Sequence, residues 1–546
     1  MKKTFITLLC AAMTMGASAD TYFFVPGDGL GDQDGTSWEN AAAGEYLGDF
    51  LSSAEPGTVL CLQEGSYKPS TTTNLWTIGP GVTLIGGYPT TMTGTDTEYD
   101  LSLGGQSIFS ADLDGDGKGD NLSDAFVYIG PGSPKDKAEE YFSSWGEPTI
   151  VKGITFRDGY RKESKYWGNM VFVQSAVAEF HYCQFLNNNS WRADRSAGGS
   201  NGAIEMWGSL VHITDCVFRD NITAAGSGAA FQIRARQSDS GASDVKESSV
   251  VIVERCEITN NIAFCTGTSV EGDASWGTYG GAFSVADNGG FLLMANNTIS
   301  ESRAWYRGSA CRLGGGKDGK PNCIYLISNT FFNNECQNGA SGNGSALSSG
   351  DNSKSFFMNN IIVEDKDYDV FDGPHAPVYL QSGTAYGYSG GYNVFGTVYD
   401  NGDKSDFVAT DKRPKSAETL NTTESVFGSN VLTDKGGVSK IIEPVLDVTG
   451  ITVAAMEAQL ATWMDEAPQF LKDAYAKYPM NLTKDQRGYV RVATTMSGAY
   501  DKDATVPVSA LPMINSKAVR CTKAVENGQF FIEKDGVRYN MLGAQL

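Results

Sequence analysis

The chain is poor in positive charge and in histidine, and after its first 19 residues it has no apolar run long enough to cross a membrane. Its 42 lysine and arginine residues against 64 aspartate and glutamate residues give a net charge of −22. This charge excludes nucleic acid and anionic lipid as expected partners. Since a membrane-spanning helix needs about 18 consecutive apolar residues, we expect no transmembrane segment.

The chain also lacks paired cysteines. None of its ten cysteines belongs to a CxxC motif, and they are scattered along the sequence. This pattern is typical neither of a zinc site nor of a small disulfide scaffold. We expect most of them to be buried thiols, and one or two disulfides remain an open alternative.

Residues 1–19 have the pattern of a secretory signal peptide. Lys2 and Lys3 precede an apolar run that ends in small residues, with cleavage expected before Asp20. Cys10 lies inside the run, but leucines precede it where a lipoprotein signal has small residues, so no lipid anchor is expected. The mature protein is therefore predicted to be secreted or attached to the cell surface, on the extracellular face of an outer membrane.

Internal repetition is the strongest signal in the sequence. The stretch CVFRDN at 216–221 returns forty residues later as CEITNN at 256–261. Such stretches begin at seven positions: Ile154, Cys183, Cys216, Cys256, Asn297, Asn329 and Asn360. Because a fixed core recurs at variable intervals, the repeat predicts a solenoid whose coils carry loops of different length.

The apolar positions change phase within each repeat. Before each repeat start, pairs such as Val211 and Ile213 alternate with residues that we expect to be exposed. After it, the inward set becomes Cys216 and Phe218. A straight strand cannot change phase, so a corner must lie between the two runs. Corners are predicted near Asp215, Arg255, Asn296, Ser328 and Asn359.

A third strand is expected to begin at a small-residue pair in each coil. These pairs are Gly202-Ala203, Gly228-Ala229, Gly281-Ala282, Ser309-Ala310 and Ser345-Ala346. Two strands that meet at a corner, followed by this third strand, make one coil of a parallel β-helix. Stacking coils about 4.8 Å apart would align the repeat starts in one column and place Cys183, Cys216 and Cys256 in an interior thiol stack.

The repeats share a recurring F-x-x-N, as at Phe185 to Asn188, and GGAF occurs at 280–283. In these motifs they resemble the repeats of polymorphic outer-membrane proteins, within the pectate-lyase-like superfamily. DGTSW at 34–38 is similar to the N-terminal cap of secreted β-helix proteins, and DQRGYVR at 485–491 with SGAY at 497–500 resembles their closing segment. The resemblance implies an all-β fold, a right-handed parallel β-helix with an N-terminal cap and a short helical C-terminal cover.

This interpretation divides the chain into five parts. Residues 1–19 form the signal peptide, 20–150 the N-terminal cap and first coils, 151–400 the central repeats, 401–505 the C-terminal coils and helical cap, and 506–546 a tail. Residues 451–479 have helical composition, interrupted at Pro468 and ended by Pro479, and we expect them to cover the last coil. The tail predicts a hairpin about Asp535-Gly536 and resembles the C-terminal tails of proteins exported by type IX secretion, which implies sorting or anchoring.

An acidic loop at 112–120 suggests a structural calcium site. Asp112, Asp114, Asp116 and Asp120 occupy positions 1, 3, 5 and 9 of an EF-hand-like loop. Position 12 is Ser123, where that pattern has a glutamate. A merely solvated loop is the alternative.

Aromatic residues in the loops are candidates for binding a partner. Trp191, Trp207, Trp276 and Trp305 are the residues that we assign to it, because flat aromatic faces suit stacking on sugar rings. Trp191 and Trp305 each lie eight residues beyond a repeat start, so they should emerge from the same corner. The alternative is that the loops fold back and bury these rings.

Catalytic residues are not assigned. The hydrolase motifs of the superfamily (NTD, DD, GHG and RIK) are absent. A lyase base could come from Arg157, Arg219, Arg234 or Arg236 beside Asp158 or Asp220. His181 and His212 should be neighbours on adjacent coils, and we expect them to be solvated; His375 is isolated.

The sequence thus predicts a monomeric adhesin-like or structural binding module for a glycan or surface protein. The alternative is a polysaccharide lyase or glycoside hydrolase on the same scaffold. The prediction leans away from an enzyme.

Overall fold

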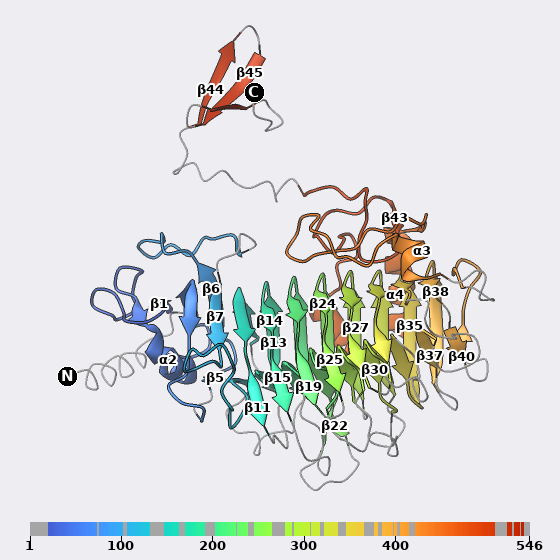
Figure 1. Ribbon diagram of the computed structural model, residues 1–546, viewed down its shortest axis with the longest axis horizontal. Helices are drawn as coiled ribbons and strands as arrows, with labels where there is room; N and C mark the ends of the chain where they lie inside the picture. The colour runs from blue at the N-terminus through green and yellow to red at the C-terminus, as the bar shows by residue number, and fades with distance from the viewer. Residues whose placement is uncertain are drawn as a thin grey trace.

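The computed structural model is built from long parallel sheets. It describes residues 20–507 and the strands within 521–539, with these gaps: 74–75, 102–105, 131–146, 163–169, 192–201, 225, 238–244, 265–278, 287–288, 306, 317–320, 337–345, 365–375, 381–384, 397, 401–404, 414–420, 527–528 and 535–536. Figure 1 shows the coils stacked along the long axis of the molecule.

Four parallel sheets form the coils. Sheet A contains, in spatial order, β2 (Ala42–Ala43), β1 (Thr21–Val25), β3 (Val59–Gln63), β6 (Thr83–Tyr88), β9 (Thr149–Lys152), β13 (Val177–His181), β17 (Leu210–Thr214), β23 (Ser249–Glu254), β27 (Gly290–Ala295), β31 (Asn322–Ile327), β35 (Ser353–Met358), β38 (Tyr386–Gly391) and β41 (Ser405–Asp406). Sheet B contains β4 (Gly65–Tyr67), β7 (Ser107–Ser110), β10 (Ile154–Arg157), β14 (Gln184–Leu186), β18 (Val217–Arg219), β24 (Glu257–Thr259), β28 (Thr298–Ser300), β32 (Thr330–Phe332), β36 (Ile361–Ile362) and β39 (Val394–Phe395).

The other two parallel sheets complete each coil. Sheet C contains β5 (Trp76–Ile78), β8 (Val127–Ile129), β12 (Val171–Gln174), β16 (Ile204–Trp207), β20 (Phe231–Arg234), β26 (Phe283–Val285), β30 (Cys311–Leu313), β34 (Leu347–Ser349), β37 (Val378–Leu380) and β40 (Val398–Asp400). Sheet D contains β11 (Tyr160–Lys162), β15 (Asn189–Trp191), β19 (Ile222–Ala224), β25 (Ile262–Phe264), β29 (Arg303–Ala304) and β33 (Glu335–Cys336).

Short helices and small antiparallel sheets make up the rest. The helices are η1 (Gly44–Tyr46), α2 (Leu47–Ser53), α3 (Thr423–Phe427), α4 (Val453–Asp465) and α5 (Gln469–Lys477). The antiparallel strands are β21 (Arg236–Gln237) with β22 (Val245–Glu247), β42 (Thr449–Thr452) with β43 (Thr494–Met496), and β44 (Cys521–Glu526) with β45 (Gln529–Lys534) and β46 (Val537–Tyr539). Strands β45 and β46 pair antiparallel on either side of the turn predicted at Asp535-Gly536, and these two residues lie outside the described ones.

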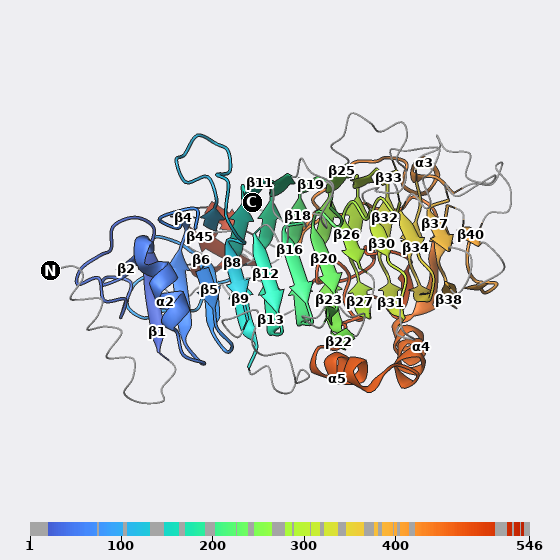
Figure 2. The same ribbon diagram turned by 90° about the horizontal axis from the view of Figure 1, so that it is seen from below.

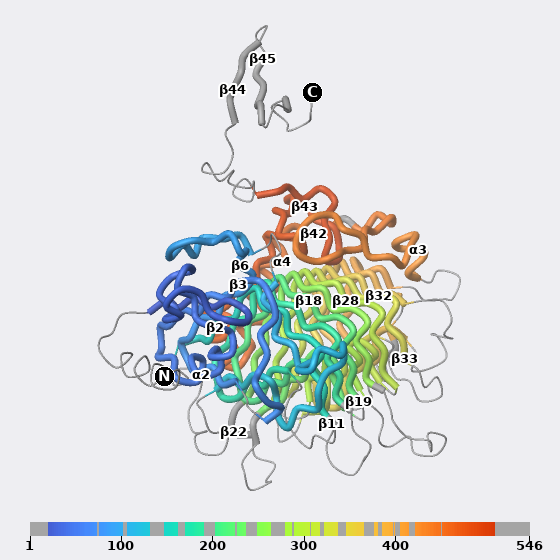
Figure 3. Tube along the Cα trace, turned by 60° about the vertical axis from the view of Figure 1, so that its left-hand side comes forward, coloured from blue at the N-terminus to red at the C-terminus, as the bar shows by residue number. Residues whose placement is uncertain are grey.

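The fold is a right-handed parallel β-helix solenoid, as the sequence predicted. One coil passes through sheets A, B, D and C in turn, as β13, β14, β15 and β16 do. Figure 3 shows the resulting stack of similar coils. The sequence predicted three strands per coil. Among the described residues, six coils have a fourth strand, which belongs to sheet D.

The predicted corners are confirmed by the backbone. All five have left-handed φ angles, between 54° and 60°: Asp215, Arg255, Asn296, Ser328 and Asn359. A second left-handed column, which the sequence analysis missed, separates sheets B and D: Asp158, Asn187, Asp220, Asn260, Glu301 and Asn333. Each corner turns the chain by a single residue, so the inward face changes phase there.

The predicted column of repeat starts is a buried ladder. The backbone N–H of Cys183 donates to Cys216 Sγ and that of Cys216 to Cys256 Sγ, and Cys256 N–H donates to Asn297 Oδ1 at 2.8 Å. The ladder continues through Asn329 and Asn360. The three thiols are fully buried, which confirms the thiol stack. The seven cysteines whose side chains are described are all free, so none of them forms the alternative disulfide.

Aromatic stacking and small residues complete the interior. Phe185 stacks on Phe156 and on Phe218 with ring centroids 4.9 and 4.7 Å apart. The alanine column before sheet C includes Ala203 and Ala282 as predicted. It takes Ala230 in place of Ala229, because Ile204 pairs in register with Phe231.

The helical segment lies elsewhere than predicted. Helices α4 and α5 confirm the expected composition and the break at Pro468. They pack along the outer face of sheet A instead of over the last coil, as Figure 2 shows. The outward residues of that face, among them Ile252, Leu293 and Tyr325, are apolar and buried there, so our expectation that they are exposed was wrong.

Candidate functional site

The acidic loop follows β7 at the level of the second corner column, because Ser110 is in register with Arg157, the residue before the corner at Asp158. Carboxylate oxygens of Asp112, Asp114 and Asp116 lie within 4.8 Å of one another, and the last two residues are exposed. Asp120 instead accepts a hydrogen bond from the backbone N–H of Leu113 at 2.7 Å, which closes the base of the loop. Gly117 has a left-handed φ of +85°, and no atom lies within 4 Å of the place where a side-chain Cβ would be.

The chemistry of this loop fits calcium. Calcium prefers several oxygen ligands in a flexible loop, and three converging carboxylates supply them. Backbone N–H groups of Gly115 and Gly117 donate to the two oxygens of Asp112, so the loop is held in its turn by its own carboxylates. The three residues Asp112, Asp114 and Asp116 would hold the ion, and Asp120 would support them.

Trp207 lies on the outer face of sheet C in a polar and aromatic cluster. Its indole N–H donates to Glu205 Oε1 at 2.6 Å, and the Arg234 guanidinium lies 5.8 Å from its ring centroid. Phe172 meets the ring edge to face at 5.7 Å. Trp207 is half-buried, so part of its ring stays available to a partner.

Glu205 is a fully buried carboxylate behind Trp207. Arg234 Nε lies 3.5 Å from its Oε1, and Arg234 is 33% exposed. The buried side chain of Arg161 adds a second positive charge near Glu205 and also pairs with Asp124 at 3.8 Å. Burial lowers the pKa of Arg161, and the charges of Asp124 and Glu205 oppose this shift.

Trp191 and Trp305 lie at the ends of strands of sheet D. Trp191 ends β15, in register with Lys162. Trp305 follows β29, is half-buried, and continues the pairing through its N–H to Ala263 O at 3.1 Å. The two residues therefore share one register column, as expected. Trp276, Arg236 (its side chain), His375 and the side chain of Trp191 lie outside the described residues.

His181 and His212 are neighbours on adjacent coils, but they are not solvated. Their ring centroids are 5.8 Å apart, and their side chains are 17% and 14% exposed. His181 Nε2 lies 2.9 Å from Glu179 and its Nδ1 lies 2.6 Å from Thr214 Oγ1. Our prediction of solvated histidines was wrong because the C-terminal segment covers them.

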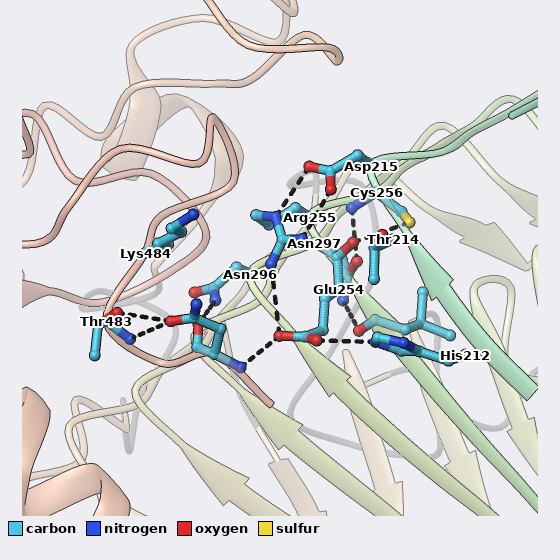
Figure 4. A network of polar contacts seen from close by, with 12 residues as sticks. His212, Thr214, Asp215, Glu254, Arg255, Cys256, Asn296, Asn297, Thr483 and Lys484 are labelled. Atoms are coloured by element: carbon cyan, nitrogen blue, oxygen red, sulfur yellow. Dashed lines mark hydrogen bonds and ion pairs between the residues drawn. The ribbon is translucent and has the colours of Figure 1, made fainter. Parts of the chain in front are cut away.

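Two residues of the C-terminal segment donate hydrogen bonds to carboxylates beside these histidines, Glu179 and Glu254. The hydroxyl of Tyr478 donates to Glu179 Oε1 at 2.8 Å, and the backbone N–H of Asn481 donates to Glu254 Oε1 at 2.6 Å. Figure 4 shows the Glu254 carboxylate between His212 and Arg255. Arg255 also donates a hydrogen bond to Asp215. The alternation of Glu179 and His181 in one strand was visible in the sequence, whereas the contact of Glu179 with Tyr478, 299 residues away, was not.

Electrostatics favour the charged form of Glu179. Burial raises its pKa, but the hydrogen bonds from His181 and Tyr478 and the attraction of both imidazoles outweigh burial and lower it overall. Burial and the Glu179 carboxylate raise the pKa of Tyr478 well above its usual value. This cluster therefore joins the C-terminal segment to sheet A through charge-assisted hydrogen bonds.

Three of the four arginines considered as lyase bases are paired, and the side chain of the fourth, Arg236, is not described. Arg157 binds Asp158 at 2.6 Å, Arg219 binds Glu257, and Arg234 binds Gln232 and Glu205. Arg157 is 46% exposed, and its β10 strand pairs with β7, so Ser110 and Arg157 are in register beside the acidic loop.

Comparisons with known proteins add little beyond the fold. No family model and no curated protein matches the chain. Solved structures that align with it include pectate lyase Pel9A, at 11% identity and TM-score 0.30, covering 75% of this chain and 84% of that one. They also include PfbA, a surface adhesin of Streptococcus pneumoniae, at 12% identity and TM-score 0.31, covering 59% and 75%. Neither alignment bears on activity, and the assignment to the parallel β-helix class stands on the four parallel sheets. In the described part of the chain, no helix is long and apolar enough to span a membrane.

Proposed function

We propose that this protein is a secreted or cell-surface binding module, adhesin-like or structural, whose long flank binds a glycan or another surface protein. The observation that carries the proposal is the flank of sheets C and D. There the side chains of Trp207 and Arg234 are partly exposed, and both contact the buried carboxylate of Glu205. The segment at 1–19 supports an extracellular destination.

The geometry suits a sugar ring at Trp207. An aromatic face takes the apolar side of a pyranose, and the partly exposed Arg234 can donate to hydroxyls at its edge, while the buried Glu205 holds Trp207 and Arg234 in place. Trp305, and Trp191 in the same column three coils away, lie about 14 Å apart at the coil spacing, which suits an extended ligand.

A glycan-array screen of residues 20–546, with calcium present, tests this proposal. We expect binding that Trp207→Ala or Trp305→Ala weakens about tenfold. Val431→Ala, at a 61% exposed side chain outside sheets C and D, is the control. If no glycan on the array binds, cell-surface proteins are tested next. No binding to those proteins either would contradict the proposal.

One observation favours the alternative, a polysaccharide lyase. Arg157 is in register with the strand that leads into the acidic loop, so a basic side chain and three converging carboxylates occupy neighbouring coils. Calcium bound at the loop would neutralise a uronate carboxylate. Arg157, released from Asp158 and neutral, would take the C5 proton, and the glycosidic C4–O bond would break as the C4–C5 double bond forms. An absorbance assay for unsaturated uronates tests it. Product formation that Arg157→Ala abolishes would establish the lyase, and binding without product would favour the module.

A further inference from the structure

A column of stacked rings runs along the outer face of sheet A toward its last strands. Tyr325, Phe356 and Tyr388 are in register on β31, β35 and β38. The rings of Tyr325 and Phe356 are 4.3 Å apart at 1°, and those of Phe356 and Tyr388 are 4.7 Å apart at 10°. Cross-strand aromatic pairs of this kind stabilise a sheet, and the stack as a whole presents ring faces along the solenoid axis.

Helix α4 packs mainly on the first part of this stack and reaches β38 through Gln459, which lies against Gly390. Trp463 of α4 lies 5.2 Å from Phe356 and 6.4 Å from Tyr325, between ring centroids. Tyr325 is 2% and Phe356 is 7% exposed, whereas Tyr388 is half-buried. Exposure therefore increases along the stack, and Tyr388 is its accessible end.

Polar groups of both charges surround that end. The next register position after Tyr388 is Asp406 of β41, an exposed residue. The exposed Lys354 places its ammonium 6.0 Å from the Tyr388 ring centroid. Tyr386, two residues earlier on the same face, has its ring centroid 4.5 Å from that of Tyr388.

We propose that Tyr388, with Tyr386, Lys354 and Asp406, is a binding subsite for a pyranose ring of a neutral glycan. One face of the Tyr388 ring is covered by Phe356, and a sugar ring would continue the stack on the other face. Lys354 donates hydrogen bonds and Asp406 accepts them, as sugar hydroxyls require. A lysine and an aspartate together carry no net charge, which favours a neutral sugar over a uronate.

An apolar protein surface is a poorer fit to the same residues. Docking such a surface on Tyr388 would bury the charges of Lys354 and Asp406 without partners, at a large desolvation cost. The subsite rests on the proposed function, because it assumes that the chain binds glycans, and it locates a contact separate from Trp207.

Saturation-transfer NMR on residues 20–546 tests the subsite, with cellohexaose and xylohexaose as neutral probes and hexagalacturonate as the acidic comparison. We expect the neutral probes to bind, and Tyr388→Ala to weaken binding at least about tenfold. Asp406→Ala, at an exposed position, should weaken binding without changing the melting temperature. The control is Tyr182→Asn, because Tyr182 is 36% exposed on another part of the surface and its φ of 55° suits asparagine.

The outcomes separate this subsite from the proposed function. Neutral probes that bind the wild type and both variants equally would overturn the subsite and leave the binding module standing. Preference for hexagalacturonate would overturn the neutral class of sugar. No transfer to any probe would also overturn the subsite, and the glycan array then decides the proposed function by itself.

Discussion

The guanidinium of Arg491 donates a hydrogen bond of 2.9 Å to the side-chain oxygen of Asn296, across 195 residues of chain. Asn296 is one of the left-handed corners between sheets A and B, and its amide nitrogen donates in turn to Asn481 O. Arg491 also donates to the carbonyl oxygens of Gly498 and Lys484. The DQRGYVR motif therefore fastens the C-terminal segment to the corner column of the solenoid.

We expect Arg491→Met to detach this segment. The side chain is 5% exposed, and its removal leaves several buried acceptors without a donor, which costs about 2 to 4 kcal/mol. Urea unfolding and limited proteolysis between residues 421 and 507 measure the effect. Arg303→Met, at a 44% exposed ion pair, is the matched control and should change little. Equal protease resistance of both variants would show that Arg491 is not the fastener.

The asparagine ladder predicts a graded series at position 329. Asn329 Oδ1 accepts from the backbone and the side-chain amide of Asn297, and its own amide donates to Met294 O at 2.9 Å. Asn329→Ala should cost about 1 to 3 kcal/mol because these buried groups lose their partner. Asn329→Cys should cost less, since Cys256 fills the same column with a sulfur acceptor. Urea midpoints of the two variants give the order, and the reverse order would contradict the ladder.

Calcium should stabilise the protein through the acidic loop. A ligand that binds only the folded state raises the melting temperature, and Asp114→Asn should abolish this rise by weakening the oxygen cluster. Asp32→Asn, at an exposed aspartate outside the loop, should keep the calcium-dependent rise in melting temperature. The comparison uses thermal melts with a chelator and with calcium at about 5 mM, a concentration on the order of that needed to fill a weak extracellular site. Identical melts of the wild type in both conditions would mean that the loop is only solvated.

The Glu179 cluster predicts a specific acid dependence. Its folded pKa lies below the usual 4.5, so the unfolded chain takes up the proton first as the pH falls. The contribution of Glu179 to stability is therefore fully present above about pH 4.5 and disappears as the pH falls through the lower folded pKa. Glu179→Gln should lower the melting temperature at neutral pH, and its difference from the wild type should shrink in acid.

Melting temperatures between about pH 3 and pH 7 test this dependence, with Glu55→Gln at an exposed site as the control. Tyr478→Phe should share the neutral-pH loss, because it removes the hydroxyl that donates to Glu179. A difference between Glu179→Gln and the wild type that does not change with pH would contradict the assignment.

The coils could be derived from the sequence because their signals are local. The change of phase between Val211 and Phe218 required a corner at Asp215, and the structure has a left-handed residue there. The second corner column was missed, since Asp220 and Asn260 precede strands of only two or three residues, too short to show an alternation. The acidic loop and the column shared by Trp191 and Trp305 were also readable, because both depend on spacing within one or a few coils.

The sequence by itself determined the solenoid, its interior columns and the helical nature of residues 453–477. Only the tertiary structure decided where those helices lie, that they bury Ile252 and Leu293 on sheet A, and that they leave Tyr388 at the accessible end of a ring stack. Periodic patterns encode which face of a strand is apolar, because burial repeats with the backbone geometry. They do not encode which distant segment covers that face, because contacts such as Arg491 with Asn296 depend on the complete stack of coils.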